Sequence, residues 1–223
     1  MQTTLSRDAL AAYLARQVTN FFPDREVAAT DLQPYVDAGL ERLAACFSRM
    51  ADKYLPAGGA PRFNHRHTDH YAMFLYLVSN TVGRLQGSPE LADKVYALNK
   101  ALHAIDVYHE VDLPEAFFFQ HPVGTVLGRA KYGNYFVAYQ RCTVGAKDRA
   151  YPTLGEGVVM YGGSAIIGGC SVGSNVWLSA GTTVMGQDVP DDTAAFGQSP
   201  QLVFKPTRRN VVRDLFNPPS GRS

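Results

Sequence analysis

The stretch LGEGVVMYGGSAIIGGCSVGSNVWLSAGTTVMGQD, residues 154–188, decides the fold. Every sixth residue in it is aliphatic or Met: Leu154, Met160, Ile166, Val172, Leu178 and Val184. Three residues further on in each hexad, Gly and Asn dominate: Gly157, Gly163, Gly169, Asn175, Gly181 and Gln187. Gly and Asn are the residues that best tolerate a positive φ. The next position is mostly small or β-branched: Val158, Ser164, Cys170, Val176, Thr182 and Asp188.

This period of six predicts a solenoid. One aliphatic side chain per hexad would point inward, a left-handed residue would turn a corner, and a short strand would form each face. Such coils bury a continuous core only by stacking on one another. An amphipathic helix does not produce a strict period of six, and a strand period of two does not demand Gly or Asn once per hexad.

The same phase extends upstream. Leu127, Tyr132, Ala138 and Val144 occupy the inward position, with one residue missing between the first two. Because Val144 and Leu154 are ten residues apart, about four residues leave the coil between them. We therefore predict a protruding loop around residues 147–152, and loops on a rigid scaffold often carry function.

The first half of the chain has a different character, poor in Gly and rich in Ala, Leu and Tyr. Apolar residues at spacings of three and four predict helices over residues 5–21, 31–54 and 69–86. Pro56 and Gly58-Gly59 would end the second helix. A fourth helix would start at Ser88 as N-cap, with Pro89 at its first position. Residues 1–105 are therefore expected to form a helical bundle.

Composition limits the class of protein. The chain has 223 residues, of which 46% are hydrophobic and 18% charged, and its formal net charge is +1. No strong field would attract nucleic acid or a membrane surface. No apolar run approaches the roughly 20 residues of a membrane span, and the first 18 residues carry charges where a signal peptide needs an apolar stretch. Three scattered cysteines do not suggest a disulfide framework. We expect a cytoplasmic protein.

Several segments outside the hexads resemble the serine acetyltransferases, a family of left-handed β-helix (hexapeptide-repeat) acyltransferases. QHPVGTVLGR (120–129) resembles that family's Asp-His-Ala-Thr-Gly motif, and Asp106 opens a segment fifteen residues before His121, as the family's Asp-Ile-His-Pro does. CTVGA (142–146) matches Val-Thr-Leu-Gly-Gly, and GQSPQLVFKP (197–206) resembles the closing Gly-Val-Pro-Ala segment.

The resemblance implies an α+β fold, with an N-terminal helical bundle followed by a left-handed parallel β-helix. The expected division is a helical domain over residues 1–105 for oligomerisation and the acceptor side, a β-helix acyltransferase domain over 106–206, and a C-terminal extension over 207–223. It also implies acetyl-CoA as co-substrate, no metal, and a homotrimer or a dimer of trimers.

Catalysis would centre on His121. A neutral imidazole suits a general base because its pKa lies near the working pH. His121 would remove the proton of an acceptor hydroxyl, which then attacks the thioester directly. Asp106 would hold the other ring nitrogen, and backbone N–H groups would stabilise the oxyanion. The resemblance places Gly145, Gly163, Ala180 and Lys205 along a CoA groove between subunits.

The acceptor side departs from the family. Gln120 replaces the Asp that precedes the catalytic His, and the family's loop Arg and His become Ala150 and Tyr151, with Arg149 shifted by one residue. Gln120, Arg149, Tyr151 and, from the helical domain, Asp69 are the candidate acceptor-binding residues. Serine and a sugar both stay open as acceptors, and so do O- and N-acetylation.

The sequence also carries features of other kinds of site and protein. The segment HRHTDH (65–70) has the density of a metal site, but a polar loop or a face of the acceptor pocket fits it better. Metal-dependent hydratases on the same solenoid need three histidines from the coils, and no histidine follows His121. Cys142 and Cys170 are expected to be small core fillers rather than nucleophiles. A non-catalytic assembly solenoid is the alternative of another class.

Overall fold

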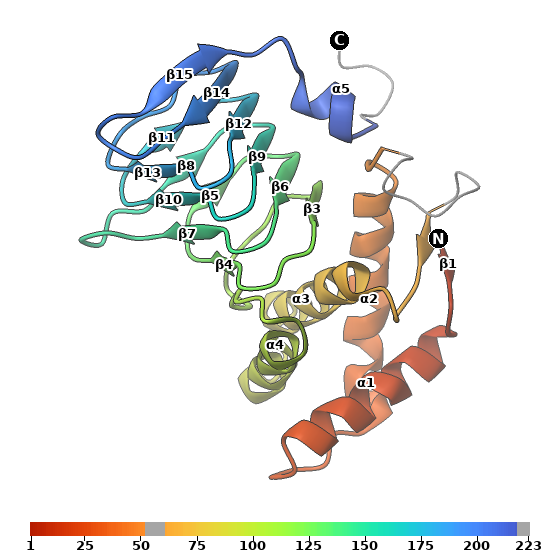
Figure 1. The fold of residues 1–223 in the computed structure, drawn as a ribbon. Helices are drawn as coiled ribbons and strands as arrows, with labels where there is room; N and C mark the ends of the chain where they lie inside the picture. Colours follow the sequence, from red (N-terminus) through yellow and green to blue (C-terminus); the bar gives the residue numbers. More distant parts are fainter. Residues whose placement is uncertain (52–60, 218–223) are drawn as a thin grey trace.

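The computed structural model describes residues 1–51 and 61–217. It confirms the expected fold class, with helices first and a parallel β-solenoid after them (Figure 1). The main helices are α1 (Arg7–Phe21), α2 (Ala29–Phe47), α3 (Thr68–Arg84) and α4 (Pro89–His103). β1 (Gln2–Thr3) pairs in parallel with β2 (Arg62–Phe63). None of the helices in the described part of the chain has the length and apolar character needed to cross a membrane.

Local sequence sets the helix ends. Ser6 and Ser88 cap α1 and α4 through their hydroxyls, which accept from the backbone N–H groups of Ala9 and Leu91. The second helix was expected to reach residue 54 but ends at Phe47, and its expected terminators Pro56 and Gly58-Gly59 lie outside the described residues. α3 is buried from Asp69 to Val82 because α2, α4 and the solenoid pack around it.

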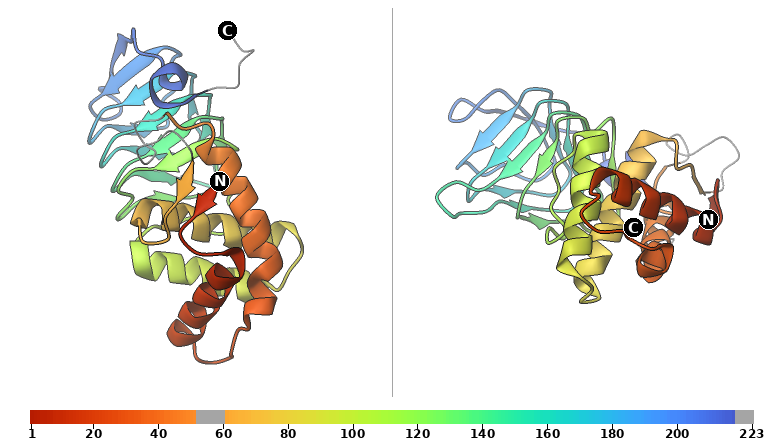
Figure 2. Two further views of the ribbon diagram at one scale, coloured as in Figure 1. Left: turned by 90° about the vertical axis from the view of Figure 1, so that its right-hand side faces the viewer. Right: turned by 90° about the horizontal axis from the view of Figure 1, so that it is seen from below.

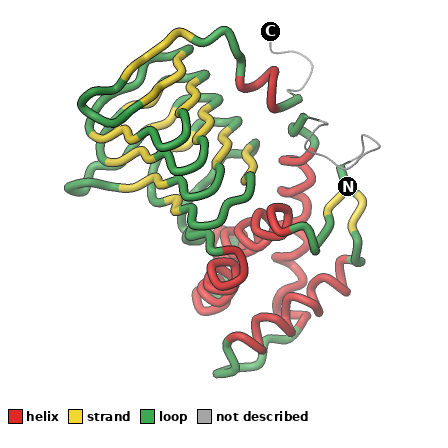
Figure 3. Tube along the Cα trace, viewed as in Figure 1, coloured by secondary structure: helices red, strands yellow, loops and turns green. Residues whose placement is uncertain are grey.

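The solenoid has three faces (Figure 3). Face 1 holds β3 (Phe117–Phe119), β6 (Phe136–Ala138), β9 (Val158–Met160), β12 (Val176–Leu178) and β14 (Thr193–Phe196), with β15 (Val203–Pro206) added antiparallel. Face 2 holds β4 (Val126–Leu127), β7 (Thr143–Gly145), β10 (Ala165–Ile167) and β13 (Thr183–Met185). Face 3 holds β5 (Lys131–Tyr132), β8 (Thr153–Leu154) and β11 (Ser171–Val172).

The hexad phase is confirmed for the inward residues. All six aliphatic positions from Leu154 to Val184 are buried, with at most 3% exposure. The corner prediction is right at Gly157, Gly163, Asn175 and Gly181, which have positive φ. It is wrong at Gly169 and Gln187, because at that corner the left-handed residues are the preceding Gly168 and Gly186.

The extra residues between Val144 and Leu154 form the predicted protrusion. Register pairs Val144 with Ile166, 22 residues on, whereas Ile166 pairs with Val184, 18 residues on. The surplus is a tight hairpin in which Lys147 and Ala150 exchange two backbone hydrogen bonds of 2.9 and 3.1 Å. Asp148 and Arg149 at its tip both have positive φ, as a two-residue type I′ turn requires.

At the corner between faces 3 and 1, a second column of glycines leaves no room for a side chain. A Cβ on Gly133 would lie 2.2 Å from the carbonyl oxygen of Gly155, and one on Gly155 would lie 2.7 Å from the carbonyl carbon of Gly173. The backbones of successive coils therefore touch there. The hexad pattern does not single out this column.

Gly155→Ala is expected to destabilise the protein by about 1–3 kcal/mol or more, because the methyl group forces two coils apart. Gly145→Ala is the matched control, since its Cβ would sit 3.5 Å from Ile167 in ordinary contact. Thermal unfolding of the two variants checks this. Equal melting temperatures would contradict the contact between coils.

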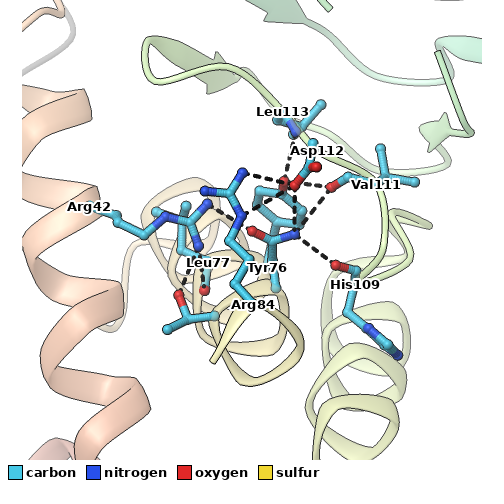
Figure 4. A network of polar contacts seen from close by, with 10 residues as sticks. Arg42, Tyr76, Leu77, Arg84, His109, Val111, Asp112 and Leu113 are labelled. Atoms are coloured by element: carbon cyan, nitrogen blue, oxygen red, sulfur yellow. Dashed lines mark hydrogen bonds and ion pairs between the residues drawn. The ribbon is translucent and has the colours of Figure 1, made fainter. Parts of the chain in front are cut away.

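Helices and solenoid share a junction. Phe117, Phe118 and Phe119 are all at most 2% exposed, and Phe117 packs edge-on against Tyr76 of α3. A polar network bridges the junction (Figure 4). Tyr76 donates to the Val111 carbonyl at 2.8 Å and accepts from the Leu113 N–H at 2.9 Å, while Asn80 donates to the His109 carbonyl at 2.7 Å.

Arg42 of α2 joins this network by donating to Asn80 Oδ1 and Thr81 Oγ1, both at 2.8 Å. The first coil of the solenoid lies against the side of α3, and in both views of Figure 2 the solenoid and the helices occupy opposite ends of the molecule.

The C-terminal segment runs back along the solenoid as far as Asn217. α5 (Val211–Leu215) follows β15, and Phe216 packs against Phe118 at a ring distance of 5.3 Å. The Asn217 N–H donates to the Arg49 carbonyl at 2.7 Å, so the end of α2 and this segment lie side by side (Figure 1). The domain boundaries at 105 and 206 stay predictions.

Candidate active site

A pocket of about 280 Å³ lies where the helices meet the first coil. It is lined by residues of three segments: Thr68 and Asp69 from the start of α3, Ala101 to Ala104 from the end of α4, and His121 to Val123 from the first coil. Asp69, one of the predicted acceptor-binding residues, therefore lines a pocket, and its acceptor role stays a prediction. The predicted base His121 lies in the same pocket.

The backbone of His121 is fixed in an uncommon conformation. It has a φ of 51°, and its N–H donates to Asp69 Oδ2 at 3.1 Å. The same oxygen lies 3.7 Å from His121 Nδ1, which is an ion-pair distance but longer than a hydrogen bond. Asp69 is nearly buried, with 9% side-chain exposure, and occupies the first turn of α3, where the helix dipole favours a negative charge.

Gln120 contacts the other ring nitrogen of His121, Nε2. Its Nε2 lies 3.1 Å from His121 Nε2. An amide NH₂ group only donates, so His121 Nε2 accepts and its proton resides on Nδ1, facing Asp69. The His121 imidazole is therefore neutral at Nε2, and the hydrogen bond from Gln120 to that nitrogen fixes this tautomer.

Asp106 was predicted to orient His121, and the structure contradicts that pairing. Its carboxylate accepts from Tyr96 Oη at 2.7 Å and Lys100 Nζ at 2.6 Å, with no hydrogen bond between Asp106 and His121. Burial acts to raise the pKa of Asp106, but these two hydrogen bonds outweigh it and leave the pKa below its ordinary value. The carboxylate beside His121 is that of Asp69.

His103 is a site residue that the sequence analysis missed. It ends α4 and lines the same pocket. Burial lowers the pKa of its imidazole, and the nearby Asp69 carboxylate opposes this only in part. The predicted fourth helix contained this histidine, but only the meeting of its end with the first coil brings His103 to His121.

A ladder of turns leads from His121 along the corner between faces 1 and 2. The turns Pro122–Thr125, Tyr161–Ser164 and Ser179–Thr182 each close with a backbone hydrogen bond of 3.0 Å. Successive turns are joined as well, for example by the Gly181 N–H donating to the Gly162 carbonyl at 3.1 Å. Two of the predicted CoA-binding residues, Gly163 and Ala180, therefore lie on one edge that reaches His121.

The other two predicted CoA-binding residues lie in different places. Lys205 on β15 holds its Nζ 5.5 Å from the ring of Phe196, whose strand continues the same edge on the next coil. Gly145 ends β7, at the opposite side of face 2 from the turn ladder. The CoA role of all four residues stays a prediction.

Arg149 and Tyr151 are not brought to His121 within one chain. Arg149 is exposed at the hairpin tip, and Tyr151 beside it is 47% exposed. This hairpin leaves the coil at the end of face 2, whereas His121 precedes its start. The single chain therefore separates these two predicted acceptor-binding residues from Asp69 and Gln120.

The histidines of the 65–70 segment and the two solenoid cysteines make packing and hydrogen-bond contacts within the fold. His65 exchanges a hydrogen bond of 2.7 Å with Thr4, and His67 stacks on His70, whose pKa burial lowers to about 4. In the described ranges no three His, Cys, Asp or Glu side chains form a metal-ligating group. Cys142 and Cys170 are buried core residues, as expected, and burial raises the pKa of both thiols.

Comparison with known proteins concerns the sequence and the fold. No family model matches the chain. Over 113 residues it is 29% identical to the serine acetyltransferase of Synechococcus elongatus, covering 48% of this chain and 46% of that protein. The chain spans about half the length of the curated relatives it matches.

Solved structures match over nearly the whole chain. The serine acetyltransferase of Vibrio cholerae superimposes with a TM-score of 0.70 and 18% identity, over 91% of this chain and 80% of that one. A serine acetyltransferase in complex with CoA gives 0.66 and 18%, over 88% and 83%. At this identity the structures establish the fold alone. In both its solenoid sequence and its whole-chain fold, the chain is therefore similar to the serine acetyltransferases.

Proposed function

We propose that the protein is an acetyl-CoA-dependent O-acetyltransferase that acts on a small hydroxyl acceptor. The observation that carries this proposal is the pocket holding Asp69 and His121 at the head of the turn ladder. The curated relatives are named serine acetyltransferases, which makes serine the first acceptor to test.

The chemistry follows from the orientation of His121. With its proton on Nδ1, its Nε2 lone pair takes the proton of the acceptor hydroxyl once Gln120 gives way. The oxygen bonds to the thioester carbonyl carbon, the C–S bond then breaks, and the imidazolium returns the proton to sulfur. The products are an acetyl ester and free CoA. Asp69 stabilises the charged ring during the step.

CoA would lie along the turn ladder. The outer positions of successive turns carry Gln140, Gly162 and Ala180, and the absence of a bulky side chain at two of them lets an extended chain approach the backbone. Lys205 would meet a phosphate at the far end. In a single chain this edge is half-buried at Gln140 and Gly162 and exposed at Ala180, which supports a groove completed by a neighbouring copy in a trimer.

A trimer, or a dimer of trimers, would also account for the hairpin. Arg149 and Tyr151 lie far along face 2 from their own His121, so they could serve the acceptor only at another copy's pocket. Three free, buried cysteines agree with a reducing compartment such as the cytoplasm.

A sugar acceptor is the second candidate, favoured by one observation. Gln120 places a neutral amide against His121, where the resemblance leads one to expect a carboxylate. A neutral amide both donates and accepts hydrogen bonds, so it can bind the hydroxyl groups of a sugar as well as an amino acid.

Release of free thiol from acetyl-CoA tests the proposal, with L-serine and a panel of sugars and amino sugars offered separately. Release with serine would assign the acceptor, and release only with a sugar would assign the second candidate. No release above hydrolysis with any acceptor, from a protein that binds CoA, would contradict the proposed transfer.

A further inference from the structure

His103 is placed in the pocket by contacts that fix its ring. Its Nδ1 lies 2.8 Å from Asn99 Oδ1, and Asn99 Nδ2 donates to the Ala72 carbonyl at 3.0 Å. Asn99 is 1% exposed and ties α4 to α3. The edge of the His103 ring also meets Tyr71, at a ring distance of 5.8 Å.

These contacts decide which nitrogen of His103 carries the proton. The Ala72 carbonyl needs a donor, so the Asn99 NH₂ group faces it and the Asn99 oxygen faces His103. That oxygen only accepts, hence His103 Nδ1 carries the proton. Its Nε2 is left as a lone pair, with no hydrogen bond to any residue of the described ranges.

The pocket is therefore rich in hydrogen-bond acceptors and lacks cations. Its lining includes Asp69, whose carboxylate lies 3.7 Å from His121 Nδ1, and His103, whose Nε2 is a hydrogen-bond acceptor. None of its lining residues, all of which are described, is Lys or Arg. Lys100, the nearest basic residue along α4, is paired with Asp106. Burial lowers the pKa of His103, which keeps it neutral and able to accept.

We propose that His103, together with Asp69, binds the ammonium group of an amino-alcohol acceptor whose hydroxyl faces His121. His103 is then a specificity-determining residue, and this inference rests on the proposed function. The pocket of one chain recognises the amine and offers no cation to an acceptor carboxylate. The acceptor class is a small 1,2-amino alcohol, with or without a carboxylate.

Equilibrium binding of three probes tests this without acetyl-CoA. Ethanolamine carries the hydroxyl and amine, glycerate the hydroxyl and carboxylate, and L-serine all three. We expect ethanolamine and serine to bind with similar affinity, and glycerate at least about tenfold more weakly, because charge-assisted hydrogen bonds are lost.

Variants at His103 separate binding from structure. His103→Phe keeps an aromatic ring but removes the hydrogen-bond acceptor. We expect it to weaken the binding of ethanolamine about tenfold and to leave the affinity for glycerate unchanged. His103→Gln restores an acceptor oxygen and should recover most of the affinity. His65→Phe, a histidine outside the pocket, is the matched control. CoA affinity reports whether each variant is folded.

Glycerate binding as tightly as ethanolamine would overturn the inference, as would a His103→Phe variant with unchanged ethanolamine affinity, or failure of the wild type to bind either amine. If His103→Phe does not fold, His103→Gln and the wild-type probe series still decide. A wild type that binds ethanolamine but releases no thiol with it or with serine supports the amine site and counts against the proposed transfer.

Discussion

Replacing His121 by alanine is expected to lower kcat by about 10²–10⁴-fold, the usual contribution of a general base. The loss should be this large because, among the residues lining the pocket, only His121 places a basic nitrogen on the turn ladder. Affinity for CoA should stay nearly unchanged, since the side chain is 73% exposed and supports no packing.

Single-turnover thiol release and CoA binding, measured on the same preparation, check this prediction. His65→Ala serves as the control, because His65 contacts Thr4 rather than the pocket. A loss of less than about tenfold in His121→Ala would be too small for a general base. The step would then have to use His103 or solvent as the base.

The solenoid could be predicted from sequence because its repeat is a packing requirement. Each inward position from Leu154 to Val184 stacks on the one below it, so the period appears directly in the residues. The loop at 147–152 was predictable for the same reason, since a surplus of residues must leave the coil. The close approach at Gly155 was not, because a contact between two backbones leaves no periodic hydrophobic signal.

Corners were predicted less well than faces. A hexad count assigns the left-handed residue to a fixed position, yet at the corner following face 2 it falls one residue early, at Gly168 and Gly186. Both hexads carry a glycine at that earlier position, so the backbone can adopt the left-handed conformation there, and a hexad count does not detect this. Because Gly168 and Gly169 are adjacent, the sequence alone does not determine which of the two is left-handed.

The carboxylate beside His121 was not the one predicted. The motif singled out His121, which lines the pocket, but spacing along the chain assigned Asp106 as its partner. The count of fifteen residues says nothing about what else faces the carboxylate, and Tyr96 and Lys100, four residues apart on one face of α4, reach it first. Asp69 and His103 come from the ends of two helices, so only tertiary packing brings them to His121.

Asp69→Asn is expected to lower kcat about 10- to 100-fold, the value of a charge-assisted contact worth about 1.5–3 kcal/mol. The Asn oxygen can still accept the His121 N–H, so the loop keeps its conformation. The variant removes the negative charge that stabilises the imidazolium, and its amide can turn toward Nδ1 and favour the wrong tautomer. Thiol release at saturating acceptor measures the effect on kcat.

Asp106→Asn is the matched comparison for this prediction. It removes the same charge fifteen residues before His121, but from a carboxylate that pairs with Lys100 and Tyr96. It should therefore lower the melting temperature slightly and leave kcat within about threefold, as expected for a half-exposed ion pair. The reverse order, a damaged Asp106→Asn and an active Asp69→Asn, would mean that the working enzyme rearranges α4 to free Asp106 for His121. Because the two substitutions are chemically identical, their order in kcat alone identifies the carboxylate that orients the base.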